Sequence, residues 1–195
     1  MVKLFRQDTQ RWVRPQQVAD PSEITLLTTL KLLWQHMPLR AMFWYRLGSW
    51  CKFKRIPLIP GFVQRYLFRY FGLEIVVGAK IGGGLYIAHP IGTVIAAREV
   101  GENCTIIANV TIGMRNEWAF PRIGDAVFIG AGARVLGDIY VGDGVSIGAN
   151  AVVIHDVPDG ATVVGIPAKA LQHRQDQKNG NQPIKAKSTA LRLKQ

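Results

Sequence analysis

The sequence has few of the residues that build disulfide frameworks or metal sites. Its 195 residues include only two cysteines, Cys51 and Cys104, in different segments, which predict neither a disulfide nor a metal site and favour a reducing compartment. Long uncharged runs are also missing, because no eighteen consecutive residues lack a charged side chain and the first residues form no long apolar run. We therefore expect no membrane-spanning segment, no signal peptide and a cytoplasmic protein.

Acidic residues are missing from one long segment. Between Glu23 and Glu74 there is no Asp or Glu, and residues 40–71 hold seven Lys and Arg interleaved with ten aromatic residues. The net charge of +11 is therefore unevenly spread. Either these aromatic residues cover a core and the charges are solvated, or the segment rests peripherally on the anionic inner face of a membrane. Nucleic acid is not an expected partner, since no nucleic-acid-binding motif accompanies the charge.

An aliphatic residue recurs at every sixth position from Ile75 to about Val157. This period fits neither a helix nor an alternating strand, and it predicts a parallel β-helix in which each hexapeptide forms a short strand and a corner. Three hexapeptides per coil would make a triangular prism with the aliphatic residues on its axis. The thirteen predicted core positions are Ile75, Ile81, Ile87, Val94, Val100, Ile106, Ile112, Ile123, Ile129, Val135, Val141, Ile147 and Val153.

The repeat is interrupted twice. The step from Ile87 to Val94 is seven residues, which predicts a bulge that aims a side chain outward. The step from Ile112 to Ile123 is eleven residues, so residues 114–121 are expected to leave the prism as a loop. Loops on a rigid scaffold are where binding groups tend to lie.

Helices are predicted before the prism and a polar tail after it. The expected organisation is a helical segment over 1–72, a β-helix domain over 73–171 and a flexible basic tail over 172–195. The helical segment is expected to cap the open end of the prism.

The boundaries of these helices follow from capping residues and prolines. Residues 1–19 show no clear periodicity and are expected to be loosely ordered. A helix is predicted to start at Asp20, with Pro21 and Glu23 in its first turn, and to run to about His36, with Pro38 as its stop. Further helices are predicted over about 40–53 and 61–71, and Gly72 ends the last one.

One histidine occupies a position suited to chemistry. His89 lies two residues after the core position Ile87 and directly before the first interruption, so its ring is expected to point outward. Glu74 lies fifteen residues earlier, close to one eighteen-residue coil, so the two could meet across neighbouring coils. A carboxylate bonded to one imidazole nitrogen makes the other nitrogen a better base. The alternative is a structural histidine and a surface glutamate.

Residues 72–171 resemble the hexapeptide-repeat, left-handed β-helix acyltransferases, in the serine O-acetyltransferase branch that includes capsule and exopolysaccharide (colanic-acid-type) O-acetyltransferases. The matching segments are 74–82, Ala88-His89-Pro90 with Gly92, 110–113, 129–133 with Leu136-Gly137, 147–149 with Val152-Val153, and 164–169.

The resemblance implies a left-handed prism and direct transfer of acetyl from acetyl-CoA to a hydroxyl, with no metal. His89 falls on the family's general base and Glu74 on its acidic partner. A coenzyme groove between subunits of a homotrimer is implied, with Gly113, Ala131 and Ala149 lining it and Lys169 meeting coenzyme phosphates.

Two departures from serine enzymes suggest a different acceptor. The loop that carries Asp-Arg-His-Pro in those enzymes reads Trp118-Ala119-Phe120-Pro121 here, and Ala88 replaces a common Asp. We therefore expect Trp118 and Phe120 to bind a saccharide acceptor of surface-polysaccharide biosynthesis, free or lipid-linked. Serine acetylation is the alternative. A zinc carbonic anhydrase is disfavoured because only His89 and His155 lie within the repeats. A non-catalytic scaffold would not need Glu74, His89 and the 165–169 segment together.

Overall fold

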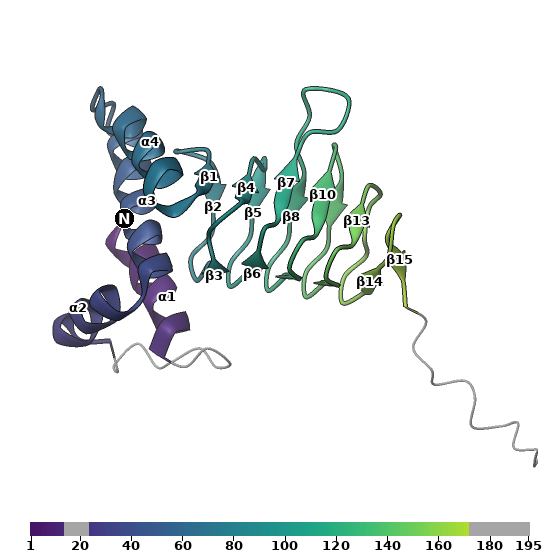
Figure 1. Ribbon diagram of the computed structural model, residues 1–195, viewed down its shortest axis with the longest axis horizontal. Helices are drawn as coiled ribbons and strands as arrows, with labels where there is room; N and C mark the ends of the chain where they lie inside the picture. The colour runs from purple at the N-terminus through teal and green to yellow at the C-terminus, as the bar shows by residue number, and fades with distance from the viewer. Residues whose placement is uncertain (14–23, 172–195) are drawn as a thin grey trace, which may run out of the picture.

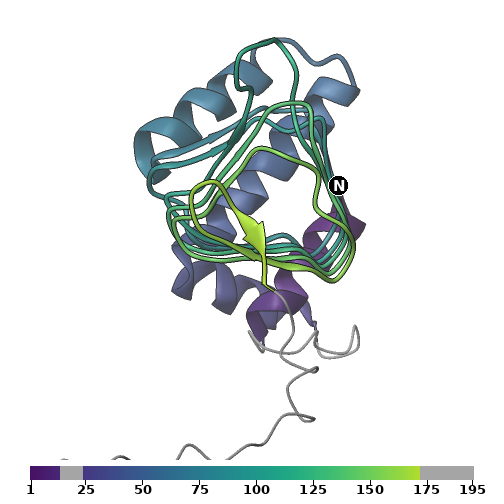
Figure 2. The ribbon, with the colours of Figure 1, turned by 90° about the vertical axis from the view of Figure 1, so that its right-hand side faces the viewer.

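The computed structural model describes residues 1–13 and 24–171, which form a triangular parallel β-helix capped at one end by helices (Figure 1). Viewed along its axis, the prism is a triangle of stacked coils (Figure 2). Each of the first four coils contributes one strand to each of three faces. The predicted architecture, mainly β with an N-terminal helical cap, is confirmed.

The three faces are three separate sheets. The first face holds β1 (Leu73–Ile75), β4 (Thr93–Ile95), β7 (Thr111–Gly113), β10 (Arg134–Leu136) and β13 (Val152–Val153). The second holds β2 (Lys80–Ile81), β5 (Glu99–Val100), β8 (Arg122–Ile123) and β11 (Tyr140–Val141). The third holds β3 (Tyr86–His89), β6 (Thr105–Ala108), β9 (Phe128–Ile129), β12 (Ser146–Ile147), β14 (Thr162–Val164) and β15 (Lys169–Ala170). Paired strands in these sheets run parallel except β15, which is antiparallel to β14.

The aliphatic residues fill the axis of the prism as the six-residue period predicts. Twelve of the thirteen predicted core positions are buried. Val94 is the exception, because it lies half-buried on the outside while Ile95 is buried and pairs in register with Ile75 and Ile112. The step between buried core positions Ile87 and Ile95 is therefore eight residues, two more than the period of six. The next step, from Ile95 to Val100, is five residues, one fewer than the period.

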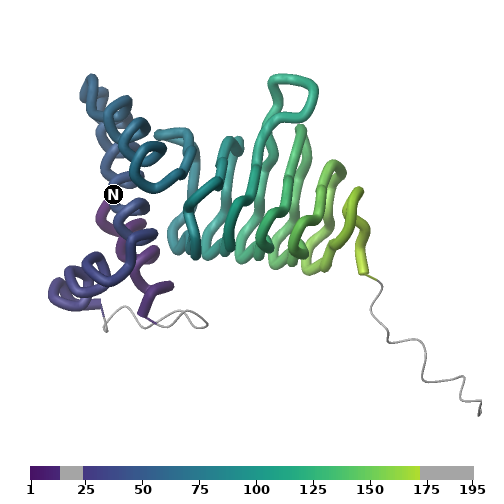
Figure 3. The backbone as a smooth tube through the Cα atoms, in the orientation of Figure 1, coloured from purple at the N-terminus to yellow at the C-terminus, as the bar shows by residue number. Residues whose placement is uncertain are grey.

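The second interruption is a loop, as predicted. Residues 114–121 leave the prism between β7 and β8 and project beyond the first face (Figure 3). The coil resumes with Val100 and Ile123 in register on the second face.

Four helices form the described part of the N-terminal segment: α1 (Val2–Val13), α2 (Leu26–Gln35), α3 (Met37–Phe53) and α4 (Ile59–Phe71). Gly72 ends α4 in a left-handed conformation at φ 60°, as predicted. Helices α3 and α4 share one continuous apolar core with the prism, through residues such as Met42, Val63 and Leu67. The helices thus cover the open end of the first coil.

Two predictions about the helices are wrong. Residues 2–13 are helical rather than loosely ordered, because tertiary contacts hold α1 in place. The predicted start at Asp20 lies outside the described residues, but α2 begins only at Leu26, after Thr25, whose hydroxyl accepts a hydrogen bond from the backbone N–H of Thr28 at 3.1 Å. The predicted end of that helix is confirmed, since α2 ends at Gln35 and α3 begins at Met37, with Pro38 in the first turn of α3, where a missing N–H is tolerated.

A buried ion pair fixes α1 to the cap and to the first coil. The Arg46 guanidinium donates to both carboxylate oxygens of Asp8, at 2.8 and 2.9 Å, and to the backbone carbonyls of Ile81 and Gly82. The backbone N–H of Leu85 also donates to Asp8. Burial raises the pKa of the Asp8 carboxyl, and the hydrogen bond from Arg46 opposes that rise. The tail over 172–195 lies outside the described residues.

Candidate functional site

His89 ends β3 at the corner between the third and first faces, and its side chain is exposed. It lines a cleft of about 500 Å³ where the prism meets the helical cap. Trp12 and His36 from the cap and Tyr86 from β3 line the same cleft. An outward-pointing imidazole beside a cleft of this size meets the first requirement for a base acting on a bound hydroxyl.

An aromatic stack forms one wall of this His89 cleft. The ring of Trp12 lies 4.7 Å from that of His36 and 4.6 Å from that of Tyr86, measured between centroids. The indole N–H of Trp12 is buried and has no hydrogen-bond partner among the described residues. Arg11 holds this end of α1 against the second coil by donating to the hydroxyl of Thr105 at 2.7 Å. The cleft is therefore built jointly by the cap and the prism.

A column of small residues runs from His89 along the prism. His89 pairs in register with Ala108 on the next coil. The backbone N–H of Gly132 donates to the carbonyl of Ala108, and that of Asn150 donates to the carbonyl of Ala131, so Ala131 and Ala149 continue the same corner. Three coil steps of about 4.8 Å make the column from His89 to Ala149 about 14 Å long. Alanine side chains leave the backbone of this corner accessible to a narrow, extended molecule.

Two other predicted coenzyme residues lie elsewhere. Lys169 is exposed on β15, at the C-terminal end of the third face and therefore beyond Ala149. Gly113 is not part of the column, because it ends β7 on the first face. A Cβ at Gly113 would meet nothing within 4 Å, so packing does not require glycine there.

Glu74 lies on the first face in a second, larger cleft. Its side chain is exposed on β1, and the cleft of about 570 Å³ runs from there to Trp118 and Phe120 of the loop. The rings of Trp118 and Phe120 pack edge to face, 5.4 Å apart. Small residues such as Ala96 and Gly113 form part of the lining. The structure thus brings together Glu74, Gly113 and both predicted acceptor-binding aromatics.

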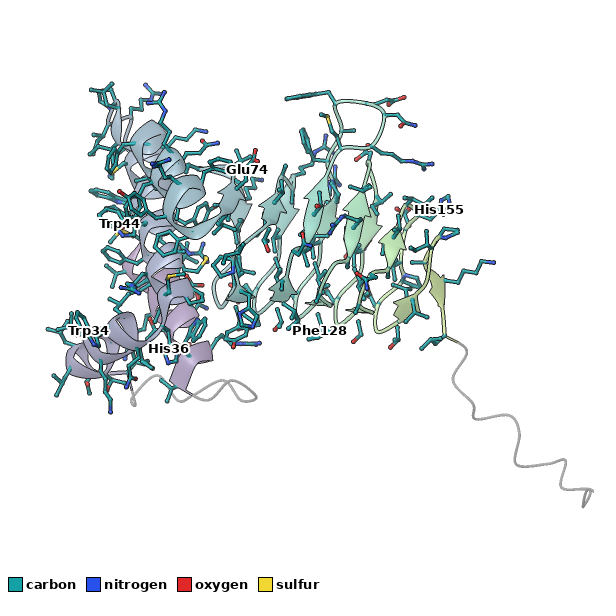
Figure 4. All side chains as sticks on the ribbon, in the orientation of Figure 1. Trp34, His36, Trp44, Glu74, Phe128 and His155 are labelled. Atoms are coloured by element: carbon teal, nitrogen blue, oxygen red, sulfur yellow. The ribbon has the colours of Figure 1, made fainter. Side chains whose placement is uncertain are left out.

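Glu74 and His89 do not share a cleft within one chain. Glu74 lies on the opposite side of the cap from His36, which lines the His89 cleft (Figure 4). No hydrogen bond links Glu74 and His89 in the described part of the chain. The fifteen-residue spacing places Glu74 on the first face and His89 at the end of the third. Their proposed partnership therefore requires contact around a corner or through another copy.

Sequence reasoning missed the residues that surround His89. Trp12, His36 and Tyr86 come from three elements, and only the fold brings them together. His36 lies at the end of α2, as its position predicted, and it also lines the His89 cleft. In the described residues no group of three His, Cys, Asp or Glu side chains is placed to hold a metal ion.

Comparison with known proteins identifies the family. Residues 120–155 match the model of the bacterial transferase hexapeptide (six repeats). The chain is 34% identical to the serine acetyltransferase of Synechococcus elongatus over 146 residues, 73% of this chain and 60% of that protein. It is 42% identical to the Helicobacter pylori J99 serine acetyltransferase over 137 residues, 68% of this chain and 80% of that protein. The chain belongs to the serine acetyltransferase family. It spans less than two thirds of the Synechococcus enzyme's length.

Solved members of the serine acetyltransferase family share the fold. The Neisseria gonorrhoeae serine acetyltransferase in complex with serine matches with a TM-score of 0.72 and 32% identity, over 86% of this chain and 68% of that one. A serine acetyltransferase in complex with CoA matches with a TM-score of 0.72 and 30% identity, over 87% and 69%. The prediction of the acyltransferase family is confirmed, and the expected acetyl-CoA agrees with the CoA complex of that relative.

The predicted saccharide acceptor is wrong. Relatives at 34–42% identity are serine acetyltransferases, and one solved relative is a complex with serine. The prediction rested on Trp118 and Phe120 replacing polar loop residues. The comparisons likewise do not show a capsule or colanic-acid branch, and they point to serine O-acetylation.

Proposed function

We propose that this chain is a serine O-acetyltransferase that uses acetyl-CoA, with His89 as its general base. The observation that carries the proposal is that the exposed His89 stands at the head of the alanine column and beside a cleft that can hold an amino acid. We propose serine as the acceptor and acetyl-CoA as the donor because the relatives are serine acetyltransferases, with solved complexes of serine and of CoA.

The chemistry assigned to His89 is a proton transfer in both directions. Its free imidazole nitrogen takes the proton from the serine hydroxyl as the oxygen attacks the thioester carbonyl carbon. A carbon–oxygen bond forms and the carbon–sulfur bond breaks. The imidazolium of His89 then returns the proton to the leaving thiolate, so the base is regenerated.

The column Ala108–Ala131–Ala149 is the proposed coenzyme track. Its length of about 14 Å suits an extended pantetheine arm, and its backbone amides are accessible because the side chains are methyl groups. Lys169, exposed beyond Ala149, is positioned to meet the coenzyme phosphates. Gly113, which lies on another face, would contact the coenzyme only as part of a neighbouring copy's groove.

Glu74 is proposed to support His89 by fixing its tautomer and stabilising the imidazolium. Because the two line separate clefts, we place the complete site at a contact between copies of a homotrimer. Trp118 and Phe120 are proposed to form the acceptor-side wall of that shared site. The exposed Trp118 supports this arrangement, since a neighbouring copy would cover it.

Peripheral contact with an anionic membrane surface is a separate proposal about location. No helix in the described segments has the length and apolar character that a membrane crossing requires. The support for peripheral contact is the acid-free, basic and aromatic segment 40–71.

The proposed function is tested by following CoA release with purified protein, acetyl-CoA and L-serine. We expect serine-dependent turnover, and a loss of about a hundredfold or more in His89→Ala with unchanged acetyl-CoA binding and melting temperature. His155→Ala is the matched control, because His155 is also exposed on the prism but lies outside the His89 cleft. Near-normal turnover of His89→Ala, or no turnover of wild type with serine, would overturn the proposal.

A further inference from the structure

The turn between α3 and α4 carries a cluster of exposed apolar side chains. We call residues 53–62 the hairpin tip; it lies at the outer edge of the helical cap (Figure 1). Phe53 is 82% exposed, Leu58 88% and Phe62 62%. Leu58 has φ 67°, an uncommon conformation for a bulky residue, and its side chain is the most exposed large apolar one in the described residues. No other residue of 1–13 or 24–171 covers these side chains.

Basic residues surround the tip, and one of them, Arg65, lines a cleft together with Glu74. Lys54 and Arg55 are exposed within it, and Arg65 and Arg69 are exposed on α4. From position 24 to position 73 the sequence contains no Asp or Glu. Lys52 is partly engaged, since its ammonium donates to the carbonyl of Val77 at 2.8 Å. The tip therefore combines apolar side chains with the positive charges of Lys54 and Arg55, and residues 53–62 include no acidic residue.

Only some residues of the segment 40–71, which the sequence analysis considered as a membrane-binding surface, are accessible to a partner. Tyr45 and Phe71 are buried in the core, and Arg46 is buried against Asp8, so these three cannot contact a partner. What remains exposed gathers at the tip and along the outer side of α4. Some aromatic residues of this segment therefore pack in the core. The aromatic residues of the tip do not.

We propose that the hairpin tip docks the protein on an anionic lipid surface, with Phe53, Leu58 and Phe62 entering the interface and Lys54 and Arg55 at the headgroups. Charge decides against a second copy as the occupant, because two tips without acidic residues repel each other. Aliphatic and aromatic side chains at one projecting turn suit a lipid interface. Nucleic acid is less suitable, because Leu58 has no aromatic face on which a base could stack.

Docking through the tip leaves the His89 cleft free. The His89 cleft includes Met37, at the start of α3, whereas the tip begins at Phe53, where α3 ends. Sixteen helical steps of 1.5 Å separate these two residues by about 24 Å. A lipid surface at the tip therefore does not cover the His89 cleft.

The test is flotation of the full-length protein with vesicles of phosphatidylcholine alone and of phosphatidylcholine with about 30% phosphatidylglycerol. We expect binding to the anionic vesicles at low salt, weaker binding at high salt, and little binding to neutral vesicles. Lys54→Glu/Arg55→Glu and Phe53→Ser/Leu58→Ser should each reduce the bound fraction about tenfold or more. Arg98→Glu/Arg122→Glu, the same charge change at exposed prism sites, should bind as wild type does.

Failure to float with either vesicle at low salt overturns the proposal, as does unchanged binding of both tip variants. Equal loss of binding in the prism control would show that net charge, not the tip, is responsible. Loss of oligonucleotide binding in the tip variants, without any vesicle binding, would assign the tip to nucleic acid instead. Flotation needs no turnover, so this result is independent of whether the proposed acetyltransferase activity is found.

Discussion

Ala108 lies beside His89 in the register of the third face, one coil further along the prism axis. If the corner beyond it holds the coenzyme, bulk there should block binding without touching the base. We expect Ala131→Leu to raise the KM for acetyl-CoA about tenfold or more, with a much smaller change in kcat. Ala119→Leu, in the loop, is the control. An unchanged KM for acetyl-CoA in Ala131→Leu would contradict the coenzyme track.

Removing the charge of Glu74 should be milder than removing His89. Glu74→Gln keeps the shape of the side chain but cannot stabilise an imidazolium, so we expect a loss of about tenfold in kcat and little change in KM. The pH profile separates a supporting role from a purely structural one. If Glu74 supports His89, the pH at which activity rises should shift downward in Glu74→Gln, because the base loses a stabilising negative charge. An unaltered profile with normal kcat would remove Glu74 from the mechanism.

The projecting loop should take part in assembly. Trp118 is exposed and packs only against Phe120 in its own chain among the ring contacts of the described residues. We expect light scattering to give three times the chain mass for wild type, and Trp118→Ser to shift the distribution toward smaller species at micromolar concentration. Glu117→Gln, an exposed change in the same loop, should leave the mass unchanged. A fully active monomeric wild type would rule out the shared site.

The buried ion pair should be costly to break from one side. Asp8→Asn leaves the Arg46 charge buried without a counter-charge, which typically costs about 3 to 5 kcal/mol. We expect a large fall in melting temperature, whereas Asp138→Asn, an exposed change on the prism, should have little effect. A small shift in Asp8→Asn would mean that α1 contributes little to stability.

The thiol of Cys104 should be unreactive in the folded protein. Burial raises its pKa to about 11, and it donates to the carbonyl of Gly124. At pH 8 very little thiolate is therefore present, and thiol reagents should modify Cys104 only after denaturation or as the pH approaches 11. Cys51 is buried as well. Mass spectrometry after brief labelling at pH 8 checks this, and rapid labelling of Cys104 would show that the second coil opens readily.

The sequence was sufficient for the prism because its core repeats one local rule. An aliphatic residue at every sixth position can be recognised without knowing any distant contact. The loop over 114–121 was predicted because this repeat is interrupted there. The same rule misplaced Val94, because two neighbouring aliphatic residues, Val94 and Ile95, compete for one inward position. Only the pairing of Ile75 with Ile95 decides between them.

The helical cap and the surroundings of His89 depend on contacts that periodicity does not record. Residues 2–13 are held by long-range contacts, such as the buried pair of Asp8 with Arg46 and the hydrogen bond from Arg11 to Thr105. Trp12 and Tyr86 meet across 74 positions of sequence, so their stacking beside His89 could not be read from spacing. The prediction of a saccharide acceptor was wrong because it relied on the composition of one loop and not on the contacts that the loop makes.

The reversed direction of β15 has a consequence for how the molecule behaves at high concentration. A stack of parallel coils is a template at both ends, because unpaired backbone groups there can recruit the coil of another molecule and grow a fibre. Helices block that growth at the first coil, and at the last coil an antiparallel strand presents a hydrogen-bonding pattern that an incoming parallel coil does not match. The same solenoid that could polymerise indefinitely is thereby limited to a single finite rod.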